Sequence, residues 1–220
     1  MSTLEVLLAP ILHSPQLAEI TLFLQRTLEE ERSRRGQFYA DMRPDQKVEF
    51  IDGSVILHSP ARNVHLQVTG WIFTLLNTYV SRHDLGTVNS EKCLCVFPRN
   101  DYEPDLVFFG TEKSALLKND TMKFPIPDLA IEVLSDSTAA RDRGVKFTDI
   151  EAHGVQEYWI VDAEESLIEQ YVRRGNRLEL RMKSGTGELR STAVPGFIVP
   201  VRACFDRIEN LKTLHAIMMQ

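Results

Sequence analysis

Two carboxylates and one lysine carry the chemistry that this sequence is best suited to perform. Asp105 lies in the apolar stretch 104–109, and Glu132 lies in the apolar stretch 131–135. Such runs are typical of strands buried on both faces. Because burying a charged carboxylate without a partner is costly, two such acids on consecutive strands predict a shared divalent metal. The nearby Lys146 indicates a phosphodiester as the substrate.

The metal interpretation has a plain alternative. Mg²⁺ commonly takes one or two carboxylates, with water and substrate phosphate completing its coordination. Such an ion lowers the pKa of a bound water and stabilises charge on the phosphorane. In the alternative, Asp105 and Glu132 lie at strand ends, solvated or paired with Arg141 or Arg143. The spacing alone leaves both interpretations open.

A second Pro-Asp pair places Asp128 on the same predicted strand as Glu132. Four residues along a strand span roughly 13 Å, which is too far for both acids to bind one ion. We therefore interpret Asp128 as a residue at the start of the strand and Asp105 as the metal ligand.

Lys146 follows in a helix predicted from the Ser137-Thr138 cap to about residue 154. Asp142 lies four residues earlier, so the two could form a surface salt bridge worth ~0.3–0.5 kcal/mol. A lysine on the inward face would instead hold the attacking water and stabilise the transition state. Gly144 within this helix costs about 1 kcal/mol relative to alanine and indicates a close approach by another group.

The elements that must position these residues follow from hydrophobic periodicity and turn signals. In chain order, the pattern first predicts an amphipathic helix (14–35), a linker (39–46), a hairpin about Asp52-Gly53 (47–58) and a helix (63–83). It then predicts strands (87–97, 105–109), a loop or short helix (111–124), a strand (128–134), the helix of Lys146 and a strand (157–162). From residue 167 it predicts short strands with turns at 174–176 and 185–187, followed by a last helix (206–217). This order predicts a mixed sheet flanked by helices, in the α/β or α+β class.

Length and charge set broad limits. A chain of 220 residues can form one sizeable core with a small appendage. We expect an N-terminal helical extension and linker over 1–46 and the main domain over 47–220. The net charge of −6 argues mildly against a large DNA-binding surface. A local basic patch remains compatible with it, and a metal ion reverses the field near its carboxylates.

The remaining residue types suggest a cytoplasmic protein. Cys93, Cys95 and Cys204 form no CxxC pair, and we interpret them as reduced thiols. No apolar run approaches the ~20 residues needed to span a bilayer, and the first residues do not resemble a signal peptide. No G-x-S-x-G elbow, Gly-rich phosphate loop or H-E-x-x-H motif occurs.

Across several segments the chain resembles the Uma family of restriction endonucleases, within the PD-(D/E)XK nuclease superfamily. The matching segments together cover roughly 47–173, and they are 49–53, 59–60 with His65, 103–107, 131–135, 137–138, 141–146 and 154–162. Each segment alone is a weak signal, but the combination is specific.

The resemblance implies a restriction-endonuclease-like fold, with a central mixed sheet and a helix on each side. It implies Mg²⁺ or Mn²⁺ held by Asp105 and Glu132, with Lys146 as the catalytic lysine. It also implies that Glu49 and His65 line the same site, although taken alone Glu49 could be an exposed strand acid and His65 a capping or packing residue. DNA as the substrate follows from the resemblance. A homodimer follows from it and from the apolar face of the first helix.

The sequence departs from the superfamily pattern at the lysine. The usual lysine lies two residues after the second acid, where this chain has Leu134. Lys146 would therefore supply the ammonium from the next helix, an arrangement that the family resemblance supports. The family motif also has an acid after Asp52-Gly53, where this chain has Ser54.

Three hypotheses follow from these observations. The first is a divalent-metal-dependent endonuclease that hydrolyses phosphodiester bonds in DNA by attack of an activated water. The second is a module with the nuclease fold that binds nucleic acid or regulates without catalysis. The third is an interaction protein in which Asp105 and Glu132 belong to structural ion pairs. Metal affinity separates the first hypothesis from the second, because a pure binding module has no need of two buried acids. Under the third hypothesis, Asp105→Asn should change stability more than any activity.

Overall fold

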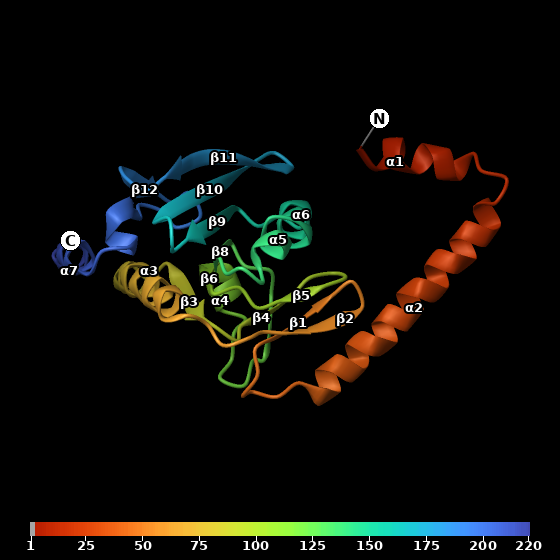
Figure 1. Cartoon of the computed structure of the whole chain (residues 1–220), viewed down its shortest axis with the longest axis horizontal. Helices are drawn as coiled ribbons and strands as arrows, with labels where there is room; N and C mark the ends of the chain where they lie inside the picture. Colours follow the sequence, from red (N-terminus) through yellow and green to blue (C-terminus); the bar gives the residue numbers. More distant parts are fainter. Residues whose placement is uncertain (1–2) are drawn as a thin grey trace.

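A six-stranded mixed sheet forms the centre of the fold, in a computed structural model that describes residues 3–220. The strands lie in the order β11-β10-β9-β8-β6-β3 (Figure 1). Their bounds are β3 Gly86–Ser90, β6 Leu106–Gly110, β8 Leu129–Val133, β9 Glu157–Asp162, β10 Leu167–Arg174 and β11 Arg177–Ser184. The pair β8 and β9 is parallel, whereas the other neighbours are antiparallel. The sheet is therefore mixed, as the sequence predicts.

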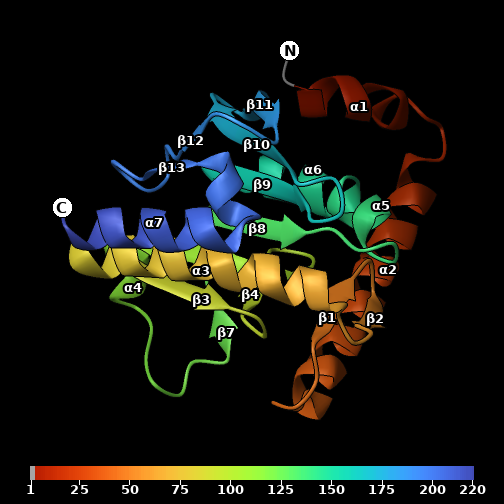
Figure 2. The same ribbon diagram turned by 60° about the vertical axis from the view of Figure 1, so that its left-hand side comes forward.

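Helices cover both faces of this sheet (Figure 2). The helices are α3 Asn63–Arg82 and α7 Arg207–Met218 on one face, and α5 Ala139–Asp142 and α6 Val145–Ala152 on the other. Along β6, Leu106 and Phe108 join the core beneath α3, while Val107 and Phe109 join the core that includes Ile150 of α6. This alternation is the period of two that a strand buried on both faces requires.

A second sheet lies beside the first and carries the predicted hairpin. Its order is β2-β1-β5-β4-β7. The bounds are β1 Val48–Ile51, β2 Ser54–Leu57, β4 Leu94–Val96, β5 Asp101–Tyr102 and β7 Lys123–Phe124. Asp52 and Gly53 both have positive φ, 48° and 77°, as a two-residue hairpin turn of type I′ requires. The hairpin prediction is therefore confirmed.

The C-terminal part adds short elements around the central sheet. The strands β10 and β11 extend that sheet, and the turns predicted at 174–176 and 185–187 are present. The remaining elements are α4 Thr111–Ser114, β12 Glu188–Arg190, β13 Ile198–Pro200 and the 3₁₀ helix η1 Val201–Cys204. Strands β12 and β13 form a separate two-stranded sheet.

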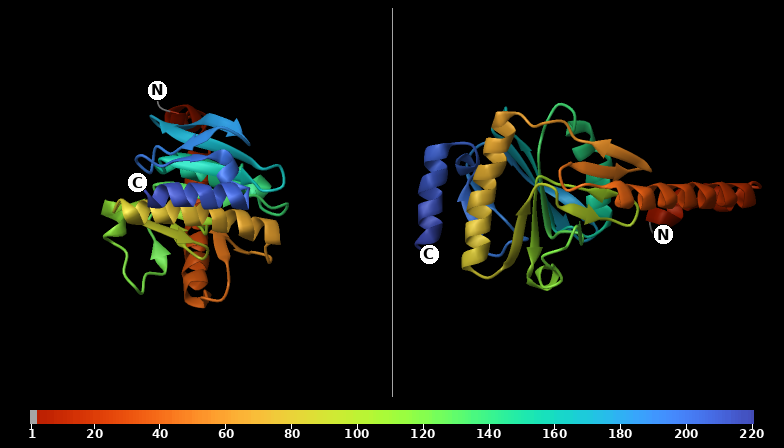
Figure 3. Two further views of the ribbon diagram at one scale, coloured as in Figure 1. Left: turned by 90° about the vertical axis from the view of Figure 1, so that its left-hand side faces the viewer. Right: turned by 90° about the horizontal axis from the view of Figure 1, so that it is seen from below.

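The N-terminal helices form an arm that projects from the body (Figures 1 and 3). They are α1 Thr3–Leu12 and α2 Leu17–Asp41. Only the C-terminal half of α2 is fastened to the body. Arg35 Nε donates to Asp101 Oδ2 at 2.7 Å, and Phe38 is buried against Phe50.

Two boundaries of predicted elements are wrong, those of the linker and of the strand that follows the second helix. The predicted linker 39–46 begins inside a helix, because α2 continues to Asp41. Tyr39 hydroxyl donates to both carboxylate oxygens of Asp101 at 3.0 Å, which holds this last turn on the body. The predicted strand 87–97 is two strands in different sheets. Glu91 and Lys92 between them have positive φ, so the chain turns there.

The helix predicted over 137–154 is also interrupted. It divides into α5 and α6 at Gly144, and Thr138 forms no side-chain cap bond with the helix. A Cβ at Gly144 would lie 2.7 Å from the carbonyl oxygen of Ala140. The close approach that the glycine indicates is therefore confirmed, and its partner is the preceding helical turn.

Two further observations bear on the expectations from composition. All three cysteines are buried free thiols. Between residues 3 and 220, no helix combines the length and the apolar character that crossing a membrane demands.

Candidate active site

The register between β6 and β8 places Asp105 and Glu132 side by side. Leu106 pairs with Ile131 in this antiparallel ladder, so one step further Asp105 faces Glu132. Side chains directly opposite each other have Cβ atoms about 4.5–5.5 Å apart. Both carboxylates are buried, and Asp105 Oδ2 accepts the backbone N–H of Val133 at 2.8 Å. The two acids therefore share one buried place at the end of the sheet.

Lys146 reaches the same place from the first turn of α6. Its Nζ lies 2.8 Å from Glu132 Oε1, 2.8 Å from Glu49 Oε1 and 3.3 Å from Asp142 Oδ1. The pair with Asp142 exists, but it is buried rather than a surface salt bridge, because both side chains are only 2% exposed. After the break at Gly144, α6 begins at Val145, one residue before the lysine, which directs this ammonium toward the sheet.

Glu49 brings the second sheet to this cluster. All four residues of β1 are buried. Glu49 Oε1 accepts the backbone N–H of Glu103 at 3.0 Å, and Oε2 lies 3.0 Å from Nε2 of His58. The structure thus places Glu49 against Lys146, whereas an exposed strand acid would point to solvent.

His65 and Lys47 contact the other carboxylate oxygen of Asp105, Oδ1. His65 Nε2 lies 3.3 Å from Asp105 Oδ1, and Lys47 Nζ lies 2.6 Å from the same oxygen. Sequence reasoning singled out His65 but missed Lys47, together with His58. Lys47 could have been found, because residues two apart on a strand share a face, and Glu49 is two residues later.

Charge and burial together set the ionisation of these acids. Burial raises the pKa of Glu132 well above its usual range; Lys146 opposes this rise, while the carboxylates of Asp142, Asp105 and Glu49 add to it. For Glu49, burial would raise the pKa, but Lys146 and His58 outweigh it and lower the pKa to about 2.

Asp105 behaves like Glu49 rather than like Glu132. Burial would raise the pKa of Asp105, but the hydrogen bond from His65 and the charge of Lys47 lower it below its usual range. For Lys146, burial would lower the pKa, but the facing carboxylates raise it well above its usual range. The cluster therefore holds a charged aspartate and a charged lysine beside an acid that resists ionisation.

The donor set fits a hard divalent cation with few protein ligands. Within residues 3–220, no group of three or more His, Cys, Asp and Glu side chains is arranged to hold a metal ion. Asp105 and Glu132 present two adjacent buried carboxylates, and two is a number that Mg²⁺ commonly takes beside water and phosphate. Burial and the neighbouring carboxylates raise the pKa of Glu132, and a bound cation would oppose that rise.

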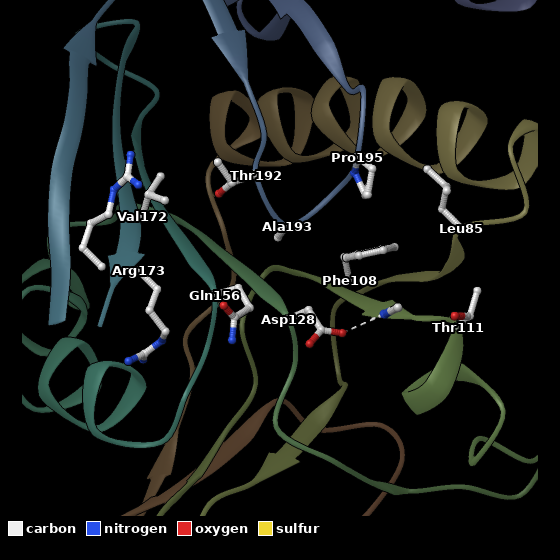
Figure 4. A pocket seen from close by; sticks show the side chains of 12 residues that line it. Leu85, Phe108, Thr111, Asp128, Gln156, Val172, Arg173, Thr192, Ala193 and Pro195 are labelled. Carbon is white, nitrogen blue, oxygen red and sulfur yellow. Dashed lines mark hydrogen bonds between the residues drawn. The ribbon is translucent and has the colours of Figure 1, made fainter. Parts of the chain in front are cut away.

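A cavity of the protein lies away from this cluster (Figure 4). It encloses about 500 Å³ and is lined by Phe108, Asp128 and Arg173 among others. Asp128 accepts the backbone N–H of Gly110 at 2.8 Å and pairs with Lys113 at 2.6 Å. The Pro-Asp acid at the start of β8 is thus held apart from Glu132, near the other end of the strand, as the spacing predicts.

Comparisons with known proteins identify a family. The family model Uma2, described as "Putative restriction endonuclease", matches residues 21–202. A crystal structure from Anabaena variabilis ATCC 29413, described as "a putative nuclease belonging to DUF820", matches with a TM-score of 0.66 and 17% sequence identity. The match covers 80% of this chain and 96% of that chain, and at this identity it shows a shared fold. No curated protein in the comparison matches the chain.

Proposed function

This chain belongs to the Uma2 family, and from that membership we propose that it is a divalent-metal-dependent endonuclease. It would hydrolyse phosphodiester bonds in DNA by attack of an activated water. The observation that carries the proposal is the meeting of Asp105 and Glu132 across β6 and β8, with Lys146 Nζ at 2.8 Å from Glu132.

Each residue of the cluster has a part in this proposal. Asp105 and Glu132 would ligate Mg²⁺ or Mn²⁺, and Lys146 is the lysine of the site. When bound, the ion would lower the pKa of a coordinated water and stabilise charge on the phosphorane. Glu49 and His65 line the site and hold Lys146 and Asp105 in place.

Cleavage of DNA by two matched variants tests the proposal. Asp105→Asn and Asp128→Asn change the two Pro-Asp acids, each of which accepts one backbone N–H and one lysine. We expect Asp105→Asn to lose cleavage of supercoiled or single-stranded DNA by about 100-fold or more in Mg²⁺ or Mn²⁺. Asp128→Asn should keep it, because Asp128 lies away from the cluster. Equal cleavage by wild type and Asp105→Asn would contradict the proposal.

One observation favours the non-catalytic module as the second candidate. Lys146 is enclosed by three carboxylates, so its charge is paired within the protein, as in a structural ion-pair network. Metal titration separates the two functions. A nuclease should bind Mn²⁺ more weakly after Asp105→Asn, whereas a module without catalysis should bind none in either form.

We also propose that the nuclease domain spans 47–220, with 1–46 as a helical extension, and that two copies associate through α2. Large apolar side chains in the N-terminal half of α2 are exposed, including Leu24 and Leu28. They lie four residues apart and so on one face of the helix. Pairing of two such faces would cover both and place two sites in one assembly, an arrangement often used to cut both strands of a duplex.

A further inference from the structure

Lys47 is the lysine of the cluster that has access to solvent. It lies directly before β1, and its Nζ is 2.6 Å from Asp105 Oδ1. The side chain of Lys47 is 20% exposed, against 2% for Lys146. A phosphodiester that approaches the acid pair from solvent therefore meets Lys47 before it could reach Lys146.

Lys146 is enclosed by carboxylates, and its side chain is only 2% exposed. The carboxylates of Glu49, Glu132 and Asp142 lie within 3.3 Å of its ammonium, and Glu132 Oε1 accepts a hydrogen bond from it at 2.8 Å. All three carboxylates are buried. To contact Lys146, a phosphate would have to displace one of these carboxylates from the ammonium and lose its own hydration. Removing one partner from such a buried group is strongly unfavourable.

Lys47 is held in a different way. Its ammonium has one carboxylate partner among residues 3–220, Asp105, and the oxygen that it contacts also lies near His65 Nε2. With Asp105 engaged by a metal, Lys47 loses this partner, because two cations repel at short range. Its ammonium then lies beside the acid pair, unpaired and facing solvent, where an anionic substrate must lie.

We propose that Lys47 contacts the scissile phosphate, and that Lys146 is a positioning residue that holds Glu49 and Glu132. The inference rests on the proposed nuclease function and divides between two lysines the role that the family pattern gives to one. Lys47 thereby supplies the positive charge that stabilises the phosphorane. Lys146 keeps the carboxylates at the spacing that they need.

DNA binding as a function of salt separates the two lysines. The variants are Lys47→Gln, Lys47→Arg and Lys146→Gln, with Lys212→Gln on the exposed side of α7 as the control. The affinity for a labelled DNA would be measured in Ca²⁺ over a range of salt, together with thermal unfolding. Each phosphate contact contributes about 0.9 to the slope of log affinity against log salt.

We expect Lys47→Gln to weaken binding and to lower this slope by about one in the folded protein, even though Asp105 loses its lysine partner. Lys47→Arg should restore the affinity for DNA and the salt slope. Cleavage by Lys47→Gln should fall by at least about tenfold. Lys146→Gln should lower the melting temperature and leave the salt slope of the folded protein unchanged. Lys212→Gln should match the wild type.

Each contrary result has a distinct meaning. If the wild type binds DNA and Lys47→Gln binds with the same affinity and slope, the inference about Lys47 is overturned while the nuclease proposal stands. A lowered slope for Lys146→Gln, without loss of stability, would overturn the positioning role. Absence of DNA binding and cleavage by the wild type would overturn the proposed function and this inference together.

Discussion

At the scale of single residues, the candidate site is a concentration of buried charge. Glu49, Asp105, Glu132 and Asp142 face Lys47 and Lys146 with little solvent between them. Desolvating ion pairs can cost as much as their attraction returns, so a network of this size is a poor way to stabilise a fold. Perturbed ionisation and partner charges of this kind are concentrated at functional sites, which favours a chemical role.

Glu169 provides a test of buried charge outside the candidate site. Burial would raise its pKa, but hydrogen bonds from Arg143, Lys183 and Tyr171 lower the pKa to about 2. An unfolded glutamate has a pKa of about 4.3. Because the folded pKa is the lower one, the charged form stabilises the fold above about pH 4.3, and this contribution is lost as the pH falls toward 2.

We predict that Glu169→Gln lowers the free energy of unfolding by about 1–2 kcal/mol at pH 7. The full linkage would be about 3 kcal/mol, but Arg143 and Lys183 are well exposed, so solvent screens the pairs. Denaturant unfolding from pH 7 to pH 2.5 measures the difference, which should shrink below about pH 4. The exposed Glu188→Gln is the control. Curves that stay parallel over the whole range would contradict the prediction.

At the scale of elements, the break between α5 and α6 determines where Lys146 points. A continuous helix over 137–154 would have carried the lysine on a different path over the sheet. Gly144, close to the carbonyl of Ala140, instead separates α5, which ends at Asp142, from α6, which begins at Val145, one residue before the lysine. Its backbone conformation thus positions a side chain that meets residues from β1 and β8.

We predict that Gly144→Ala destabilises the protein by about 1–3 kcal/mol and reduces cleavage. The added Cβ would lie 2.7 Å from the oxygen of Ala140, so the helix start must shift, as overpacking usually requires. Gly36→Ala in α2 is the matched control, because its Cβ would meet nothing within 4 Å. That variant should gain about 0.5–1 kcal/mol from helix propensity. Unfolding in denaturant measures both, and equal effects would contradict the argument.

At the scale of the whole molecule, the arm formed by α1 and α2 stands out from the body (Figure 3). Apolar side chains on its outer half are exposed, among them Leu22, Phe23, Leu24 and Leu28. Exposed apolar surface of this kind marks interaction sites. The helix expected at 14–35 is present as α2 Leu17–Asp41, and it packs on the body only at its C-terminal end.

We predict that Leu24→Glu breaks the association of two chains. Leu24 shares a helix face with Leu28, whereas Leu22 points to the other side, so Leu22→Glu is the control. Light scattering should give a mass of about two chains of 25.1 kDa for the wild type and for Leu22→Glu. Leu24→Glu should give one chain. A wild type that is already a single chain would contradict the dimer.

The sequence predicted well where the information was local. The hairpin at Asp52-Gly53 and strands β8 and β9 follow from turn residues and apolar runs, which act between near neighbours. Predictions failed where distant contacts overrode local signals. The linker at 39–46 is helical up to Asp41 because Asp101, far along the chain, holds Tyr39.

The sequence by itself therefore indicated that Asp105 and Glu132 belong to apolar stretches in or next to strands, and which family the chain resembles. Only the tertiary structure decided that Lys47 meets Asp105 and that Lys146 is enclosed by Glu49 and Glu132. The physical reason is distance along the chain. Burial of a strand follows from its own residues, but an ion pair between two strands and a helix depends on register, crossover and a glycine break, which no single segment encodes.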